Sequence, residues 1–432
     1  MVASVNDREL ILEILLMITR DGEYSHIALK QVLDQYQYLD KKERAFITRV
    51  VNGTLERMIE IDYIIDRFSK VKVNKMKPVI RAIMRSAVYQ LKYMDSVPDS
   101  AVCNESVKLA EKRGFRPLKG FVNGVLRNIS RNLAEVSYPE DELERASIQY
   151  SVPEWMLKQW KDDYGLNIAI QMAESFLEES PLSVRCNFQK IQKEDLLKLL
   201  EEEGVHTEEV PGMENALYLS GYDYLAGLES FQKGYYQVQD VSSMQVAAWA
   251  DPKEGDYIID VCAAPGGKAI HAAELLNETG HVEARDLTDY KVNLIWENIR
   301  RSGLTNIEAV RWDATAYEES SEEKADIVIA DLPCSGLGVL GRKPDLKYKM
   351  TKKTQKELEQ LQRKILGVVH HYVKPGGKLV YSTCTVNRAE NIENARWFTK
   401  VCPEFTLVKE EQRIPGTDSG DGFYIALFQR KE

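Results

Sequence analysis

The fold of the C-terminal half can be worked out from one stretch, Tyr257-Ile258-Ile259-Asp260-Val261-Cys262-Ala263-Ala264-Pro265-Gly266-Gly267-Lys268-Ala269. Residues 257–259 form an apolar run typical of a buried strand, residues 263–267 are typical of a tight turn, and residues 271–276 are typical of a helix. Adjacent glycines let the backbone approach a ligand closely, and free amides at a helix start favour electron-rich groups. The stretch therefore predicts the first β-turn-α unit of an open α/β sheet, with a nucleotide-like cofactor at the turn.

The glycine pattern narrows the choice of cofactor. The dinucleotide fingerprint G-x-G-x-x-G is absent, and the turn has only one Gly pair and a Pro. A pyrophosphate cradle is therefore disfavoured relative to a site for a cofactor with adenosine and no phosphates. A purely structural turn is the alternative.

Four consecutive predicted strands each end at an aspartate. The run 257–259 leads to Asp260, and the runs 281–285, 307–312 and 325–330 lead to Asp286, Asp313 and Asp331. Ligands of open α/β sheets bind at the carboxyl edge, and an acid at the tip of the second strand can accept both ribose hydroxyls. We therefore predict that the cofactor lies along this edge.

Two thiols are expected at the same edge. Cys334 follows Asp331-Leu332-Pro333, and Cys384 follows a fifth strand at 378–381, itself preceded by a helix over 354–373 and a turn at 375–377. A lone cysteine at a strand end is more often a buried filler. Two at one edge suit methylation at carbon 5 of a pyrimidine, in which a thiolate adds to C6 before C5 takes the methyl group. Asp331 could bind N3 and the exocyclic amine of cytosine. The residues alone leave open which thiol attacks.

Length and composition set outer bounds. At 432 residues the chain is too long for one core, so we expect two or three domains. No apolar run approaches the roughly 20 residues that span a bilayer, and the N-terminus lacks a signal pattern. We expect a cytoplasmic, monomeric protein without a membrane partner.

The six cysteines form no C-x-x-C pair and have no His cluster nearby. This spacing argues against a zinc site and against a disulfide framework, so we expect no metal and reduced thiols. The cysteines are Cys103, Cys186, Cys262, Cys334, Cys384 and Cys402.

The first part of the chain, from Asn6 to about Arg131, has apolar residues at helical spacing and predicts an all-α bundle. Asn6 or Asp7 is placed to cap the first helix, and Asp40 to cap a helix over 41–59. Between residues 70 and 131 there are fourteen Lys and Arg but four acids, in a chain of net charge -10. A basic face of this kind is typical of phosphate binding; a merely solvated surface is the alternative.

Residues 136–180 are expected to form a helical connector, and residues 181–235 a small α+β module with strands at 182–187 and 216–219 and a helix at 193–203. Arg185 and Asn187 of this module could reach RNA phosphate or sugar, or the module could be a structural lid.

Two resemblances add to this reading. Residues 97–110 and Phe121-Val122-Asn123-Gly124-Val125-Leu126-Arg127 resemble the NusB-like RNA-binding domain, which implies RNA contact by residues 1–135. From residue 181 on, the chain resembles the Nop2/Sun RNA cytosine-C5 methyltransferases, which implies a Rossmann-like class I methyltransferase domain over 236–432. The phrases that carry this resemblance are 260–268, Asp331-Leu332-Pro333-Cys334-Ser335, Arg342-Lys343-Pro344-Asp345-Leu346-Lys347-Tyr348, Ser382-Thr383-Cys384-Thr385 and Gly420-Asp421-Gly422-Phe423-Tyr424.

The Nop2/Sun resemblance implies S-adenosyl-L-methionine as cofactor and, with the NusB-like bundle, 16S ribosomal RNA as partner, with cytosine 967 as target. It also implies that Cys384 is the nucleophile, that Cys334 assists product release, and that Asp331 is the third catalytic residue. The implied cofactor contacts are Cys262, Ala263, Ala264, Pro265, Gly266, Gly267, Lys268, Asp286, Asp313 and Asp331.

One position departs from the family. Ala269 stands where Thr or Ser is usual, which would remove a hydroxyl that caps the helix start and weaken cofactor binding slightly.

Three other functions stay open. A transfer-RNA cytosine methyltransferase shares every catalytic motif, an RNA-binding assembly factor would lack activity, and a nicotinamide oxidoreductase would leave both edge cysteines unexplained.

Overall fold

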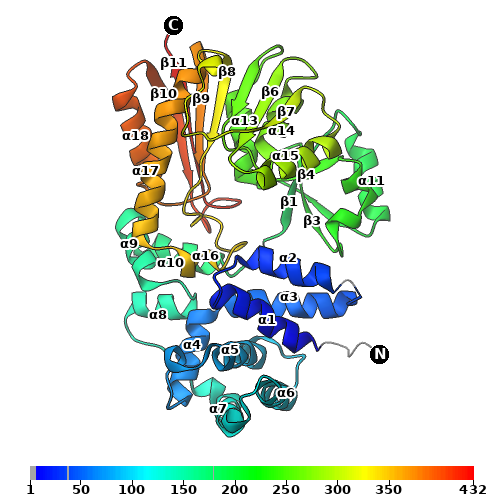
Figure 1. Cartoon of the computed structure of the whole chain (residues 1–432), viewed down its shortest axis with the longest axis vertical. Coiled ribbons are helices and arrows are strands. Elements are labelled where there is room, and N and C mark those ends of the chain that lie inside the picture. The colour runs from blue at the N-terminus through cyan, green and yellow to red at the C-terminus, as the bar shows by residue number, and fades with distance from the viewer. Residues whose placement is uncertain (1–5, 37, 179) are drawn as a thin grey trace. The chain divides into compact units, whose positions relative to one another are not determined.

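The computed structural model describes residues 6–36, 38–178 and 180–432 (Figure 1). The chain divides into two compact units. Unit 1 is Met1–Glu178 with Leu340–Lys349, and unit 2 is Glu179–Val339 with Met350–Glu432. Of the helices in the described ranges, none is both long and apolar enough to cross a membrane.

Unit 1 is helical, as expected. Its bundle consists of α1 (Asp7–Thr19), α2 (Ser25–Gln35), α3 (Lys41–Glu56), α4 (Met58–Phe68), α5 (Pro78–Tyr93), α6 (Asp99–Lys112) and α7 (Lys119–Asn132), with short 3₁₀ turns at Val73–Lys75, Arg116–Leu118 and Leu133–Glu135. Asn6 caps α1 by accepting from the Arg8 amide, and Asp40 forms a capping box with Glu43 at α3.

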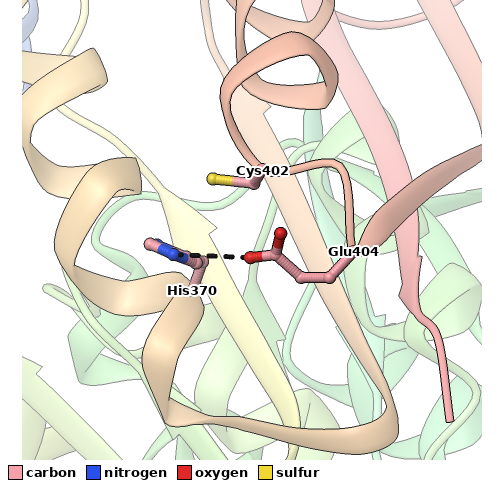
Figure 2. A group of neighbouring side chains, drawn as sticks. All are labelled: His370, Cys402 and Glu404. Carbon is pink, nitrogen blue, oxygen red and sulfur yellow. Dashed lines mark ion pairs between the residues drawn. The ribbon is translucent and has the colours of Figure 1, made fainter.

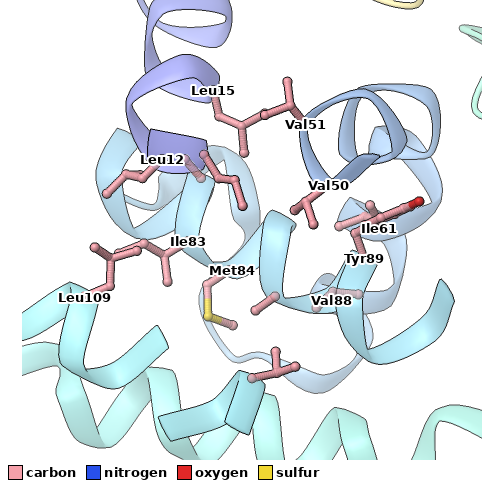
Figure 3. Packing of buried hydrophobic residues seen from close by; sticks show 14 of the residues in the cluster. Leu12, Leu15, Val50, Val51, Ile61, Ile83, Met84, Val88, Tyr89 and Leu109 are labelled. Atoms are coloured by element: carbon pink, nitrogen blue, oxygen red, sulfur yellow. The ribbon is translucent and has the colours of Figure 1, made fainter. Parts of the chain in front are cut away.

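The core of the bundle is built around α5. Figure 3 shows its Ile83, Met84 and Val88 packed among apolar side chains of α1, α3, α4 and α6. Gly53 lets α3 lie close to α5, because a Cβ on Gly53 would lie 2.0 Å from the ring of Tyr89 in α5. The apolar stripes of these helices therefore meet in one continuous core.

The helix predicted over 41–59 is wrong at its end. Arg57 has a ψ of 14°, so α3 stops at Glu56 and α4 begins at Met58. The change of direction lets Ile61, Ile64 and Ile65 of α4 enter the core, which a single straight helix would carry past it.

Two further parts complete unit 1. The connector forms α8 (Glu142–Gln149), α9 (Glu154–Tyr164) and α10 (Leu166–Ser175). Residues 340–349, which include α16 (Leu346–Lys349), pack on the bundle although they follow Cys334 in sequence. Asp345 accepts from the Ser25 hydroxyl at 2.6 Å, while Lys347 and Tyr348 donate to main-chain carbonyls near the end of α3 at 2.8 and 2.7 Å. The segment thus satisfies helix-end carbonyls that would otherwise need water.

Unit 2 contains two sheets. The smaller is antiparallel with order β2-β3-β1-β4, from β1 (Leu182–Cys186), β2 (His206–Glu209), β3 (Ala216–Ser220) and β4 (Tyr236–Val238), with α11 (Lys193–Glu202), α12 (Glu229–Gln232) and a 3₁₀ turn at Leu225–Gly227. The predicted strands and helix are present, and β2 and β4 were not predicted.

The larger sheet has order β10-β11-β9-β8-β5-β6-β7. Its strands are β5 (Tyr257–Asp260), β6 (His281–Asp286), β7 (Ile307–Arg311), β8 (Ala325–Asp331), β9 (Val373–Thr383), β10 (Phe405–Arg413) and β11 (Phe423–Arg430). The strands β7-β6-β5-β8-β9 are parallel and β11 is antiparallel to β9. From β5 the chain adds β6 and β7 on one side of the sheet, and from β8 it adds β9 on the other side. The topological switch point therefore lies between β5 and β8.

Apolar side chains alternate between the two faces of the larger sheet, and helices cover both faces. Ile259, Val328 and Leu379 pack under α17 (Lys352–Val369) and α18 (Ile392–Val401). Their neighbours Ile258, Ile327 and Val380 pack under α13 (Val241–Ala250), α14 (Gly267–Leu275) and α15 (Asp289–Ser302). The predicted α/β fold is confirmed.

Two local predictions in this domain are wrong. The helix expected over 354–373 ends at Val369, followed by a 3₁₀ turn at His370–Tyr372. The expected turn at 375–377 lies inside β9, where the pairing with β8 shifts between Val373 and Lys378. Ala325 pairs with Val373 and Ile327 pairs with Lys378, so the Pro and the glycines between them form a bulge in β9.

Candidate cofactor and thiol site

The glycine-rich turn lies at the switch point, between the end of β5 and the start of α14. Ala263 N–H donates to the Arg285 carbonyl at 2.8 Å, and Ala264 N–H donates to Asp286 Oδ2 at 3.0 Å. Gly266 has φ of +107° and forms the N-cap of α14. The turn is thus attached to β6, and its glycine adopts a conformation that a side chain would oppose.

The four strand-end aspartates lie in one row, in the order Asp331, Asp260, Asp286 and Asp313. Asp331 Oδ2 is 2.7 Å from Lys268 Nζ, and its Oδ1 accepts from the Ser382 hydroxyl at 2.7 Å. Burial, followed by the charge of Asp331, raises the pKa of Asp260 to about 8. Asp260 therefore carries a proton at neutral pH.

Asp286 and Asp313 differ in exposure. Asp286 is 3% exposed, and its Oδ1 lies 3.0 Å from Lys291 Nζ. Asp313 is exposed, and hydrogen bonds from the Thr315 amide and hydroxyl lower its pKa. A shallow cleft beside Asp313 is lined by Leu287, Arg311, Trp312, Asp313 and Ala316. Leu287, which is 55% exposed in this cleft, was not predicted; its place directly after Asp286 was the available signal.

The two thiols meet at the ends of adjacent strands. β8 and β9 are paired so that Asp331 lies opposite Ser382, and the Cys334 and Cys384 sulfurs are 3.3 Å apart. The contact with Cys384, together with burial, raises the pKa of the Cys334 thiol well above its usual range. The Cys334 thiol therefore stays protonated at neutral pH.

The loop after Cys334 is closely packed. Gly338 donates to the Cys384 carbonyl at 3.1 Å and accepts from the Gly422 amide at 2.9 Å. A Cβ on Gly338 would lie 1.9 Å from the Gly422 carbonyl oxygen. The segment around Gly422 thus packs against the loop after Cys334, which is itself hydrogen-bonded to Cys384.

Two site expectations are wrong. Arg185 is 1% exposed, pairs with Glu274 of α14 and donates to Gln239 at 2.8 Å, while Asn187 is 4% exposed. Both join the small sheet to the larger domain and do not offer groups to RNA, because a buried guanidinium needs its carboxylate partner. Ala269 is not at the helix cap, since α14 begins at Gly267 and Ala269 is fully buried among apolar side chains.

Three side chains that carry possible metal-ligand atoms lie together elsewhere in unit 2. Figure 2 shows His370, Cys402 and Glu404 pointing toward one another, with ligand atoms within 4.8 Å. The His370 ring nitrogen Nδ1 is 3.0 Å from the Leu366 carbonyl, and Nε2 is 3.6 Å from Glu404. Burial raises the pKa of Cys402 to about 11. The group lies near the beginning of β9, at the end of the strand opposite Cys384, and sequence reasoning missed it because the residues are far apart in the chain.

Three family models match the sequence. The model described as 16S rRNA methyltransferase RsmB/F matches residues 247–429, the NusB family matches 5–131, and an RsmF/B-like ferredoxin-like domain matches 152–223. The probable ribosomal RNA small subunit methyltransferase B of Bacillus subtilis (strain 168) is 38% identical over 94% of this chain and 91% of its own. The chain belongs to the RsmB/F family of 16S rRNA methyltransferases. This confirms the family predicted from the motifs.

Other proteins resemble this RsmB/F-family chain over most of its length. A Synechocystis sp. protein with the same name as the Bacillus one is 34% identical over 90% of this chain and 87% of its own. The crystal structure of PH0851 has a TM-score of 0.84 and 26% identity, covering 99% of both chains. NSun6 from Pyrococcus horikoshii with SFG has a TM-score of 0.59 and 24% identity over 65% of this chain and 98% of its own, which shows a shared fold.

S-adenosylmethionine is the cofactor of this RsmB/F-family chain, and the residues at the carboxyl edge fit it. The buried Oδ2 of Asp260 has no hydrogen-bond partner among the described residues, although it borders the turn. Burial alone would lower the pKa of Lys268, but the Asp331 carboxylate raises it, so Lys268 stays charged. The edge thus combines carboxylates, helix-start amides and an apolar cleft, as an adenosine with an amino-acid tail requires.

Proposed function

We propose that the chain transfers a methyl group from S-adenosylmethionine to C5 of a cytosine in 16S ribosomal RNA, cytosine 967 being the expected target. The observation that carries the proposal is the 3.3 Å contact between Cys334 and Cys384 at the cofactor edge. The names of the relatives support the RNA class, and the thiol pair supports the ring position.

The proposed reaction needs two thiol roles. The Cys384 thiolate forms a bond to C6 of the cytosine, which raises electron density at C5. When bound, S-adenosylmethionine supplies the methyl group that C5 takes. A base then removes the C5 proton, the bond between Cys384 and C6 breaks, and the thiolate is restored. Cys334, whose sulfur lies 3.3 Å from that of Cys384, is placed to assist this release.

Asp331 is the proposed contact to the base. One of its oxygens is held by Ser382 and the other by Lys268, so the carboxylate is fixed between the cofactor turn and the thiol loops. In this position it would accept a hydrogen bond from the exocyclic amine of cytosine, and from N3 when N3 carries a proton. The target nucleotide must leave its stack to reach such a site.

The proposed cofactor contacts follow the edge. Residues 262–268 would surround the methionine part, Asp286 would accept the ribose hydroxyls and Asp313 would contact the adenine. Leu287 joins this set, because its exposed side chain lines the same cleft as Asp313.

We assign RNA binding to unit 1. A cleft in this unit is lined by several cations, including Arg81, Arg85 and Lys349. Lys112, Arg113, Arg116 and Lys119 are exposed on and after α6. Such groups bind phosphate without reading sequence.

The test uses the full chain with labelled S-adenosylmethionine and unmodified 16S RNA, and compares wild type with Cys384→Ala and Cys334→Ala. We expect wild type to methylate, Cys384→Ala to be inactive without an RNA adduct, and Cys334→Ala to accumulate an adduct that survives denaturation. Methylation of transfer RNA instead would replace the substrate and keep the chemistry. No transfer to either RNA would favour a non-catalytic assembly factor.

A further inference from the structure

The distance between the two thiols is set by loops. β8 ends at Asp331 and β9 at Thr383, so Cys334 and Cys384 both lie beyond the ladder that pairs their strands. Loops are more mobile than strands. A sulfur separation of 3.3 Å therefore requires something that joins the two loops.

One buried carboxylate contacts both loops, in addition to the hydrogen bond from the Gly338 amide to the Cys384 carbonyl. Glu390 is 0% exposed and accepts from the Ser335 amide at 2.9 Å and the Ser335 hydroxyl at 2.5 Å, directly after Cys334. It also accepts from the Asn387 side-chain amide at 2.8 Å, three residues after Cys384. The Ser335 hydroxyl in turn lies 2.7 Å from the Thr385 hydroxyl, next to Cys384.

Two amide side chains near Glu390, those of Gln362 and Asn391, add hydrogen bonds to the two thiol loops. Gln362 of α17 donates to Glu390 at 2.9 Å and to the Pro333 carbonyl at 2.8 Å, so contacts reach both sides of Cys334. Asn391 accepts from the Thr383 hydroxyl at 2.5 Å and donates to the Thr385 carbonyl at 2.8 Å, so contacts also reach both sides of Cys384. A buried network in which every member is satisfied is rigid, and loss of one member leaves other groups unpaired.

We propose that Glu390 is the positioning residue that holds Cys334 and Cys384 in contact. This inference rests on the proposed function for its effect on methylation, but its geometric part does not. The negative charge of Glu390 also lies near Cys334 and contributes, after Cys384 and burial, to the raised pKa of that thiol. Through its hydrogen bonds Glu390 thus sets the distance between the thiols.

The direct test measures thiol spacing without RNA. Phenylarsine oxide condenses with two neighbouring thiols to form two As–S bonds and releases one water, with no change in oxidation state. We expect wild type to take up one equivalent at the Cys334–Cys384 pair, located by peptide mass, and Cys334→Ser to lack it. Glu390→Gln, which replaces an accepting oxygen by an NH₂ facing donors, should weaken this uptake by at least about tenfold, because buried donors lose their partner.

The second readout separates positioning from folding. In Glu390→Gln we expect kcat for methylation to fall by about tenfold or more, with unchanged RNA KM, unchanged S-adenosylmethionine affinity and accumulation of the RNA adduct. Glu60→Gln is the matched control, because Glu60 is also a buried carboxylate, 3% exposed, with Lys92 and two tyrosines as partners in unit 1. It should keep wild-type arsenical uptake.

Wild-type arsenical uptake by a folded Glu390→Gln protein would overturn the proposal. If that variant does not fold, Ser335→Ala is used, since it removes only the hydroxyl between Glu390 and Thr385. Its uptake should be weaker than wild type, and equal uptake would likewise overturn the proposal. A normal arsenical result combined with no methylation by wild type would instead count against the proposed function.

Discussion

Lys268 Nζ lies 2.7 Å from Asp331 Oδ2, so an ion pair joins the helix of the cofactor turn to the end of the strand that leads to Cys334. Both side chains are largely buried, at 16% and 26% exposure. The pair therefore connects the turn proposed to bind the cofactor with the loop that carries Cys334.

The first prediction concerns this ion pair. Lys268→Met leaves the Asp331 carboxylate without its cation. We expect kcat/KM for methylation to fall roughly thirtyfold, which corresponds to a loss of about 2 kcal/mol in transition-state stabilisation. Lys268→Arg keeps the charge and should retain more activity. Calorimetric titration of S-adenosylmethionine together with steady-state methylation measures both effects, and equal activity of the Met variant would contradict the prediction.

The second prediction concerns pH. The pKa of Asp260 is raised from 3.8 to about 8, so the folded protein holds a proton that the unfolded chain has released. Relative to Asp260→Asn, wild type should lose stability as the pH rises from about 4 to about 8, by at most about 1.4 kcal/mol per pH unit, and change little above that range.

Urea unfolding of both proteins across this pH range tests the prediction. Asp195→Asn, at a carboxylate whose side chain is 66% exposed, serves as the control and should parallel wild type. Parallel curves for wild type and Asp260→Asn would show that Asp260 is ionised in the folded state.

The third prediction concerns the basic surface of unit 1. Reversing Lys112, Arg113 and Arg116 to Glu should weaken RNA binding and reduce the slope of log K against log salt by roughly 0.7–0.9 for each lost phosphate contact. Cofactor affinity should not change. The cations of the Lys112–Glu9 and Arg116–Glu111 ion pairs are exposed, at 64% and 81%, so loss of these pairs costs little stability.

A matched control reverses Lys198, Lys253 and Lys353, whose side chains are 73%, 67% and 87% exposed in unit 2. Filter binding at several salt concentrations compares the two triple variants. A steeper loss of affinity in the control would place the RNA surface elsewhere.

The fourth prediction concerns the loop after Cys334. Gly338→Ala places a Cβ 1.9 Å from the Gly422 carbonyl oxygen and should destabilise the protein by about 1–3 kcal/mol, with reduced arsenical uptake by the thiol pair. Gly367→Ala in α17 is the control, because a Cβ there meets nothing within 4 Å. It should be neutral or stabilise by roughly 0.5–1 kcal/mol. Thermal unfolding decides between these outcomes, and similar shifts for both variants would contradict the packing argument.

The elements of the fold were largely predictable because local patterns report local structure. Apolar pairs such as Ile258 with Ile259 predicted strands buried on both faces, and the caps Asn6 and Asp40 marked helix starts. The end of α3 and the bulge in β9 were not predictable, since packing against other segments decided them. Local preferences are weak compared with such tertiary contacts.

The sequence by itself determined the family, the strand-end aspartates and the presence of two thiols at one edge, because motif order and strand period survive without coordinates. Only the tertiary structure decided that Arg185 is buried against Glu274, that Asp345 binds Ser25, and that Glu390 reaches both thiol loops. Ser25 and Asp345 are 320 residues apart, and no local pattern encodes such a contact. A polar side chain becomes a ligand contact, a structural tie or a positioning group according to what surrounds it, and those surroundings come from distant parts of the chain.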